Sequence, residues 1–381
     1  MIQKLTNPIA EMAQKGQLTG ILLIFSTVIS VGLSNSALQS WYLHFWHLQL
    51  GTSFLQLSLE HWINDGLMVI FFFMVGLEIR REVVQGELSD IRQSLLPVMA
   101  AVGGMAVPAL FFVIFNLQSG FLNGWAVPTA TDIAFSLGVL SLMGNKVPFA
   151  LKIFLTALAI IDDLGAVLVI AVFYTGEIHL DQLLYAVATI VLLLAFNRFK
   201  VRPLIFYILP GMVLWWFILH SGVHATIAGV VLAFCIPMHA VEKVEHALQR
   251  PVNFLILPLF ALANTAIPFP EGGIRVLFQP LSLGIIAGLL IGKPLGIFSV
   301  AWLSVRAGWT QLPQLVSWRK LLAAGFAAGI GFTMSIFIAN LAFSDILVLD
   351  GSKLAILVGS LAAGVVSVLL LATDKESVAD E

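Results

Sequence analysis

Long apolar runs recur along the whole sequence and are separated by short polar connections. Twelve of these runs reach or approach the length of about 20 residues that a helix needs to cross a bilayer. They lie near residues 17–35, 60–84, 95–116, 124–143, 148–175, 181–198, 203–219, 222–238, 252–270, 281–305, 321–343 and 353–373. The pattern predicts a single domain, an all-α polytopic membrane protein with twelve transmembrane helices. The first run lacks an A-x-A-type cleavage site, so we interpret it as a retained helix rather than a secretory signal.

One connection follows a different period. Residues 43–59 read LHFWHLQLGTSFLQLSL, in which apolar and polar side chains alternate around Gly51 and Thr52. Alternation with a turn signal predicts a small β-hairpin on the outer face. An amphipathic loop at the membrane surface is the alternative. An exposed hairpin has a free edge strand, which favours pairing with a second copy of the chain.

The composition and the placement of basic residues agree with the membrane assignment. Hydrophobic residues make up 59% of the chain and charged residues only 10%, against about 25% in soluble domains. If the N-terminus is cytoplasmic, sixteen of the nineteen Lys and Arg residues fall on the cytoplasmic side, Arg275 and Lys353 fall outside, and Lys293 lies within the membrane. This asymmetry supports twelve spans with both termini in the cytoplasm. Nothing in the charge balance indicates a nucleic-acid partner, and the single cysteine excludes an internal disulfide or a cysteine metal site.

Few ionisable side chains fall inside the expected spans. They are Asp65 and Glu78 in the second span, Asp132 in the fourth, Asp162 and Asp163 in the fifth, and Lys293 in the tenth. A charge at the bilayer centre costs at least about 2.5–3.5 kcal/mol, so such residues predict a site for ions or protons. Asp65 and Glu78 lie near the ends of their span, where they can instead reach interfacial water. For the four deeper residues, the alternative is a purely structural cluster of ion pairs.

Asp162 and Asp163 are adjacent, and adjacent residues of a helix point about 100° apart. The two carboxylates therefore cannot share one role, and one of them can face a cavity while the other faces a partner. Lys293 is the only lysine or arginine that we expect at depth, and an unpaired buried charge is costly. Lys293 is therefore the natural partner of one aspartate, and the sequence leaves open which one.

Two expected spans contain signals of helix interruption. The fourth has Pro128, which removes a backbone donor, followed by oxygen-bearing side chains that include Thr131 and Asp132. The eleventh reads GFAAGIGFTMS over residues 325–335, with Gly329 and Gly331 at its centre. Unwound backbone at membrane depth is tolerated where it lines a cavity or is buried in protein. Carboxylates, hydroxyls and carbonyls are also the ligands that a hard cation such as Na⁺ prefers.

The two discontinuous helices occupy corresponding places in two three-helix units, over about residues 95–175 and 281–373. In the expected topology, the first unit starts from the cytoplasmic side and the second from the outside, so the units are inverted repeats. Such a pair is the sequence signature of a transporter that works by alternating access.

Five segments together resemble the bacterial NhaA-type sodium/proton antiporters. They are PTATDIAFSLGVL (128–140), AIIDDLGA (159–166), SGVHATIAGV (221–230), GLLIGKPLGI (288–297) and GIGFTMSIFIA (329–339). The resemblance runs essentially from end to end. Inverted repeats and broken helices are documented for this family, so the two lines of argument are not independent.

The resemblance implies an electrogenic antiporter of the bacterial inner membrane, not an enzyme, which exports Na⁺ or Li⁺ for external H⁺ and needs no cofactor. Asp163 would be the principal ligand of Na⁺, with Asp162 and Thr131 beside it and Asp132 supporting the site. Asp162 would pair with Lys293. His224, Glu78 and Glu245 match positions linked to pH response, and we add Asp65 to this group. The hairpin would carry the contacts of a homodimer.

Three other classes of membrane protein use buried acids. An intramembrane aspartyl protease needs its aspartates on different helices and usually a GxGD sequence, which is absent here. A cation channel typically builds its pore from repeated subunits, whereas this chain has inverted repeats and a buried lysine. A sodium/proton symporter is the nearest alternative, because its architecture could look alike.

Overall fold

The computed structural model describes residues 2–52, 55–269 and 272–374. Contacts divide the chain into two compact units, which are treated separately below. The first unit comprises Met1–Val28, Asp90–Ala166 and Ile267–Glu381, and the second comprises Ile29–Ser89 and Val167–Ala266. The long helices α1 (Ile2–Ser34) and α7 (Phe149–Phe173) each contribute to both units.

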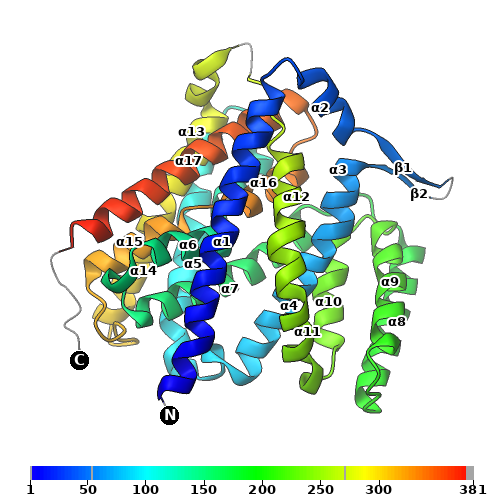
Figure 1. Cartoon of the computed structure of the whole chain (residues 1–381), viewed down its shortest axis with the longest axis horizontal. Helices are drawn as coiled ribbons and strands as arrows, with labels where there is room; N and C mark the ends of the chain where they lie inside the picture. The colour runs from blue at the N-terminus through cyan, green and yellow to red at the C-terminus, as the bar shows by residue number, and fades with distance from the viewer. Residues whose placement is uncertain (1, 53–54, 270–271, 375–381) are drawn as a thin grey trace. The chain divides into compact units, whose positions relative to one another are not determined.

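The first unit contains the two expected interrupted helices. Its elements are α5 (Ile91–Asn116), η3 (Leu122–Thr129), α6 (Ile133–Leu142), η4 (Gly144–Lys146), η6 (Gly273–Phe278), α13 (Pro280–Ala287), η7 (Gly288–Gly292), α14 (Lys293–Arg306), α15 (Trp318–Ala328), α16 (Phe332–Ala342) and α17 (Ile346–Ala372). Both α13 and α14 pack on α5, while α17 packs on α13, α15 and α16 (Figure 1). The short segment η7 is a π-helical turn directly before Lys293.

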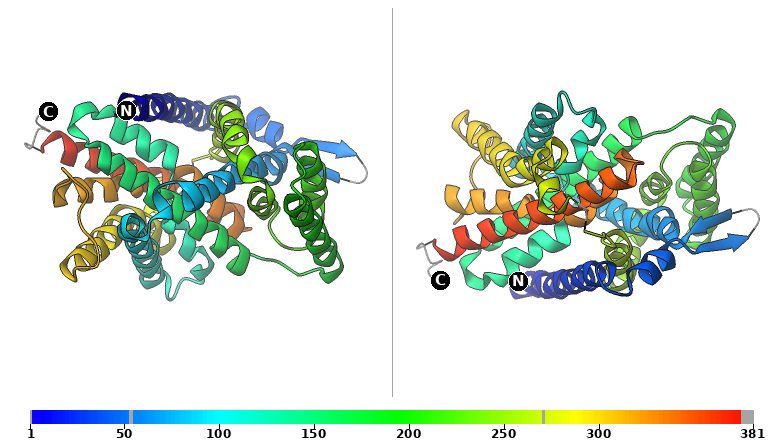
Figure 2. Two further views of the ribbon diagram at one scale, coloured as in Figure 1. Left: turned by 90° about the horizontal axis from the view of Figure 1, so that it is seen from below. Right: turned by 90° about the horizontal axis from the view of Figure 1, so that it is seen from above.

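The second unit is a helical bundle with the hairpin. Its elements are α2 (Gln39–Trp46), β1 (Gln49–Thr52), β2 (Leu55–Ser58), α3 (Leu59–His61), η1 (Trp62–Leu67), α4 (Met68–Gln85), η2 (Glu87–Ser89), α8 (Leu180–Arg198), α9 (Ile205–Leu219), α10 (Thr226–Cys235), α11 (Met238–Pro251), η5 (Val252–Ile256) and α12 (Leu257–Asn264). Helix α4 packs on α10 and α11, and α8 runs beside α9 (Figure 2).

The hairpin exists, but it is shorter than the sequence predicts. Its antiparallel strands pair Gln49 with Ser58 and Thr52 with Leu55. Residues 43–46 belong to α2 instead, because Tyr42 and Trp46, four residues apart, bury their rings on one side of a helix. Gly51 was expected at the turn but lies in β1, where its φ of 136° suits a residue without a side chain. The link between the strands, at residues 53–54, lies outside the described residues.

All twelve expected spans coincide with helices. Within the described part of the chain, seven helices are long and apolar enough to cross a membrane, and two further pairs are bent at a short break, which gives up to nine spans. The helices Ile205–Leu219 and Thr226–Cys235 are apolar but shorter. The structure therefore establishes a multi-pass helical protein, and the count of twelve remains a prediction.

Two lysines besides Lys293 are buried in the protein. Lys353 lies in α17, which begins at Ile346, and Lys320 lies in α15. The sides of the membrane expected for them remain predictions. Asp350 also falls inside α17 and was not among the expected acids. The polar residues Asp350 to Lys353 interrupt the apolar run and hid this early start, although Asp345 is an N-cap residue. Lys293 is therefore one of at least three buried lysines.

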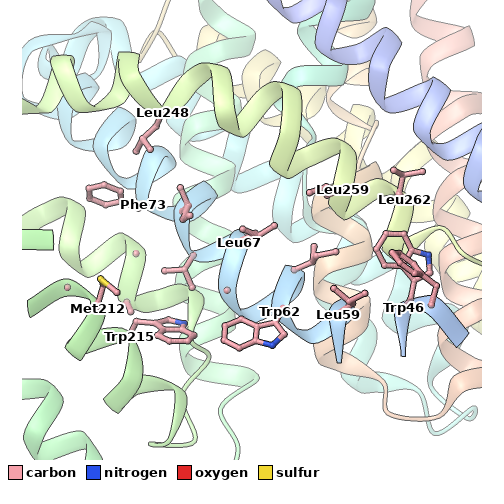
Figure 3. A pocket seen from close by; sticks show the side chains of 18 of the residues that line it. Trp46, Leu59, Trp62, Leu67, Phe73, Met212, Trp215, Leu248, Leu259 and Leu262 are labelled. Carbon is pink, nitrogen blue, oxygen red and sulfur yellow. The ribbon is translucent and has the colours of Figure 1, made fainter. Parts of the chain in front are cut away.

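An apolar cavity of about 1080 Å³ lies within the second unit. Figure 3 shows the rings of Trp46, Trp62 and Trp215 among its walls, with aliphatic side chains between them. Among the described residues, no charged side chain lines this cavity, and none of the candidate ion-binding residues does. The chemistry of ion binding must therefore be sought elsewhere.

Candidate ion-binding site

Two helix interruptions form the framework of the site in the first unit. Helical structure ends at Thr129 and resumes at Ile133, with Ala130 and Asp132 in extended conformations between them. Pro128 lies inside the 3-10 segment just before this break. In the other interrupted helix, Gly329–Gly331 separate α15 from α16, whose axes differ by 45°.

Hydrogen bonds join the two breaks to each other. They satisfy backbone groups that a continuous helix would pair internally, which is the condition for unwound chain at membrane depth. The donors and acceptors are Asp132 N to Ile330 O (2.7 Å), Thr131 Oγ1 to Ala328 O (3.0 Å), Ser136 Oγ to Ala327 O (2.7 Å) and Ser335 Oγ to Val127 O (2.7 Å). The breaks therefore hold each other in place through buried polar contacts.

Asp132 caps two helices at once. Its Oδ1 accepts a hydrogen bond from Phe135 N (3.0 Å) at the start of α6. Its Oδ2 accepts from Thr333 N (3.2 Å) and from Thr333 Oγ1 (2.5 Å) at the start of α16. Both helix N-termini carry partial positive charge, which a carboxylate stabilises. Asp132 is therefore fully engaged in holding the two interrupted helices.

Lys293 pairs with Asp162, which resolves the choice that the sequence left open. Lys293 Nζ donates to Asp162 Oδ2 at 2.5 Å and also to the carbonyl oxygen of Thr129. Thr131 Oγ1 lies 2.6 Å from the same Oδ2 and shares its single proton between this oxygen and Ala328 O. The Lys293 side chain has no exposed surface and Asp162 is 2% exposed, so the pair is dry. Its cation also lies at the end of the η3 segment, where carbonyl groups favour positive charge.

The other oxygen of Asp162 differs from the first. Oδ1 is buried and has no hydrogen-bond partner among the described residues. Asp163 follows on α7, is only 2% exposed, and acts electrostatically on Lys293. A carboxylate oxygen without a donor can accept a proton or coordinate a hard cation. The site therefore contains two buried acids, one ammonium and one hydroxyl. They lie around a carboxylate oxygen that can accept a proton or coordinate a cation.

The remaining candidates belong to the second unit. Glu245 in α11 is held by Arg81 of α4 through two hydrogen bonds of 2.8 and 3.2 Å, and Arg81 also contacts Glu82 at 2.5 Å. Glu78 lies within electrostatic range of Glu245 and Arg81. Asp65 and His224 lie within electrostatic range of each other. Trp215 Nε1 donates a hydrogen bond to the backbone carbonyl of Asp65.

Several polar contacts were missed by the sequence argument. Arg81 was counted only among the basic residues of the cytoplasmic side, although it is the partner of Glu245. Glu82, which also contacts Arg81, was not considered. Thr333 and Ser335 were noted only as signs of interruption, yet they bind Asp132 and Val127. The hydroxyl side chains beside the glycines of this segment could have predicted these contacts, because backbone groups freed by a helix break need hydrogen-bond partners.

Replacing Lys293 by Met should destabilise the protein strongly at pH 8. The change leaves the Asp162 charge buried without its partner, a loss of about 3–5 kcal/mol. We expect a lower melting temperature in detergent, and recovery of most of it in Lys293→Met/Asp162→Leu, where no buried charge is orphaned. Lys243→Met, at an exposed lysine of α11, is the control. Equal melting temperatures for Lys293→Met and the unaltered protein would contradict the role given to this pair.

Comparison with known proteins identifies the family of this chain. The family model described as Na⁺/H⁺ antiporter 1 matches residues 10–371. The Na⁺/H⁺ antiporter NhaA of Flavobacterium psychrophilum is 50% identical over 369 residues, which cover 95% of each chain. NhaA 2 of Flavobacterium johnsoniae is 51% identical over 93% of this chain and 90% of its own. NhaA of Pelagibacter ubique is 45% identical over 97% of this chain and 98% of its own. With interrupted helices, buried acids and these relatives together, the chain belongs to the NhaA family of Na⁺/H⁺ antiporters.

Proposed function

We propose that this protein exports Na⁺ or Li⁺ in exchange for external H⁺, with both cargoes competing for Asp162 and Asp163. The observation that carries the proposal is the state of Asp162. One of its oxygens accepts from Lys293 and Thr131, and the other is buried without a donor among the residues described. With Asp163 adjacent, this carboxylate can exchange its ammonium partner for a cation. Asp163 and Thr131 would supply further oxygen ligands to Na⁺.

Competition follows from the cost of buried charge. Without Na⁺, the two aspartates hold protons or are balanced by Lys293. When Na⁺ arrives, its charge neutralises the carboxylates, weakens the hold of Asp162 on Lys293 and promotes release of protons. When protons return from the other side, the cation is expelled. The site therefore carries Na⁺ in one direction and H⁺ in the other, because it does not hold Na⁺ and all of its protons at the same time.

We further propose that the exchange is electrogenic. If two H⁺ enter for each Na⁺ that leaves, one net positive charge enters per cycle. The membrane potential then drives export with about 2.3 kcal/mol per 100 mV. Two acids and one lysine give the site enough titratable groups for a double proton load.

Alternating access would arise from inverted repeats over about residues 95–175 and 281–373. Each repeat contains one of the interrupted helices, and these helices contact each other at their breaks. Rocking around that crossing would open the site to one side at a time.

We place the protein in the bacterial inner membrane with both termini in the cytoplasm and infer a homodimer through the β1–β2 hairpin. The basis is the distribution of Lys and Arg in the sequence and the two-stranded hairpin, which leaves edges for pairing. Removal of residues 49–58 should give monomers in cross-linking, and a persistent dimer would contradict this interface.

Asp163→Asn should abolish exchange. The change removes the charge that binds Na⁺ while keeping nearly the same shape. We expect no Na⁺-dependent dequenching of a pH-sensitive dye in proteoliposomes with an acidic interior. Asp162→Asn should instead mainly alter proton coupling, because Asp162 is the partner of Lys293. Asp181→Asn, at an exposed carboxylate of α8, is the matched control. Normal exchange by Asp163→Asn would contradict the proposal. If Na⁺ quenched the dye in the unaltered protein and did not dequench it, the protein would be a symporter.

His224, Asp65, Glu78 and Glu245 are proposed to contribute to pH response. His224 is the best single test, because the ordinary pKa of an imidazole lies near neutrality. We expect His224→Ala to move the pH profile of exchange, whereas His246→Ala, at an exposed position of α11, should not. If the two variants have the same profile as the unaltered protein, His224 has no such role.

A further inference from the structure

Helix α17 contacts both halves of the second interrupted helix through serine hydroxyls. Ser360 Oγ accepts hydrogen bonds from Gly331 N (3.2 Å) and Phe332 N (3.1 Å) at the start of α16. Ser367 Oγ donates to the Ala323 carbonyl of α15 at 2.8 Å. The two serines are seven residues apart, which places them on one face of α17. Both are buried, so water does not replace these contacts.

Ser360 accepts hydrogen bonds from N–H groups at the start of α16 that have no acceptor within that helix. The first N–H groups of a helix lack partners within the helix. Gly331 stands at the N-cap position and has no side chain that could accept a hydrogen bond, and α16 has no side-chain cap of its own. Ser360 takes the first two N–H groups, and Asp132 takes the third, from Thr333. The cap of α16 is thus shared between α17 and a carboxylate of the candidate site.

The shared cap connects Ser360 to the ion-binding residues in a few steps. Asp132 bonds both to Thr333 N and to its hydroxyl, so a shift at the start of α16 moves Asp132. Thr131 precedes Asp132 in the same extended segment and donates to Asp162 Oδ2. A shift of α16 should therefore also displace Thr131 relative to Asp162 Oδ2, the oxygen that Lys293 binds.

We propose that Ser360 is a positioning residue for cation binding. By capping α16, it fixes the alignment of Asp132 and Thr131 with Asp162. The inference rests on the Na⁺/H⁺ exchange proposed above and adds a residue to that site that does not touch the cargo.

The experiment compares three buried serines of α17. Ser360→Ala removes the shared cap, Ser367→Ala removes a contact between helices away from the break, and Ser352→Ala removes a bond to Val348 within α17 itself. All three lose one buried hydroxyl. Na⁺ dependence and pH profile of exchange are measured in proteoliposomes, together with melting temperature.

Only Ser360→Ala should change the apparent Na⁺ affinity. Buried N–H groups left without an acceptor are costly enough to change an equilibrium constant about tenfold. We expect about a tenfold rise in the Na⁺ concentration for half-maximal exchange and a shifted pH profile. Ser352→Ala and Ser367→Ala should stay within about twofold of the unaltered protein, a change that corresponds to less than one hydrogen bond.

A second pair of variants keeps the test valid if Ser360→Ala folds poorly. Ser360→Cys keeps the shape but accepts hydrogen bonds weakly, so it should show the same change to a smaller degree. Ser360→Thr keeps the hydroxyl and should recover the Na⁺ dependence. Unchanged Na⁺ dependence and pH profile in Ser360→Ala or Ser360→Cys, or equal changes in Ser367→Ala, would overturn the inference. Absence of exchange in the unaltered protein would instead contradict the proposed function.

Discussion

The buried ammonium of Lys293 contacts Asp162 and the carbonyl oxygen of Thr129, and the interrupted helices meet around it. A helix that stops inside a membrane exposes carbonyl groups at one end and N–H groups at the other. In this protein Lys293 serves the carbonyl end of one interrupted helix, and Asp132 serves the N-termini of α6 and α16. A cation and an anion thus stabilise opposite ends of the breaks. These two buried side chains therefore connect the interrupted helices of the first unit to each other.

The same pair would also account for the proposed exchange of ions. A buried ion pair gains little net stability, because desolvation offsets most of the attraction. Under the proposed function, Na⁺ or a proton would therefore replace Lys293 as the partner of Asp162 at a small net cost. Asp132, with three hydrogen bonds to helix N-termini, does not have that freedom. In the proposed mechanism, Asp132 is therefore the fixed charge of the cluster, and Asp162 and Asp163 are the exchangeable ones.

Much of the framework could be predicted from the sequence, because membrane spans and helix breaks are local signals. The expected ranges fell on helices, and Pro128 and Gly329–Gly331 lie at the two interruptions. Residue spacing alone could not choose Asp162 over Asp163 as the partner of Lys293, because the choice depends on how α7 is rotated against α14. The family resemblance implied Asp162, and the structure has that pair. The limits of the hairpin and the early start of α17 were also misjudged, since buried aromatic rings and an N-cap outweighed the residue pattern. The role of Ser360 could not be predicted, because its acceptor function depends on how α17 packs against the start of α16.

In the proposed mechanism, Na⁺ and protons compete for the same buried acids. Proton release tests it most directly: NaCl is added to the purified protein in detergent at low buffer concentration, and the pH of the solution is followed. The account predicts a saturable acidification with NaCl or LiCl that an organic cation salt of equal ionic strength does not produce. Binding of Na⁺, detected by calorimetry in parallel, without any release of protons would contradict it.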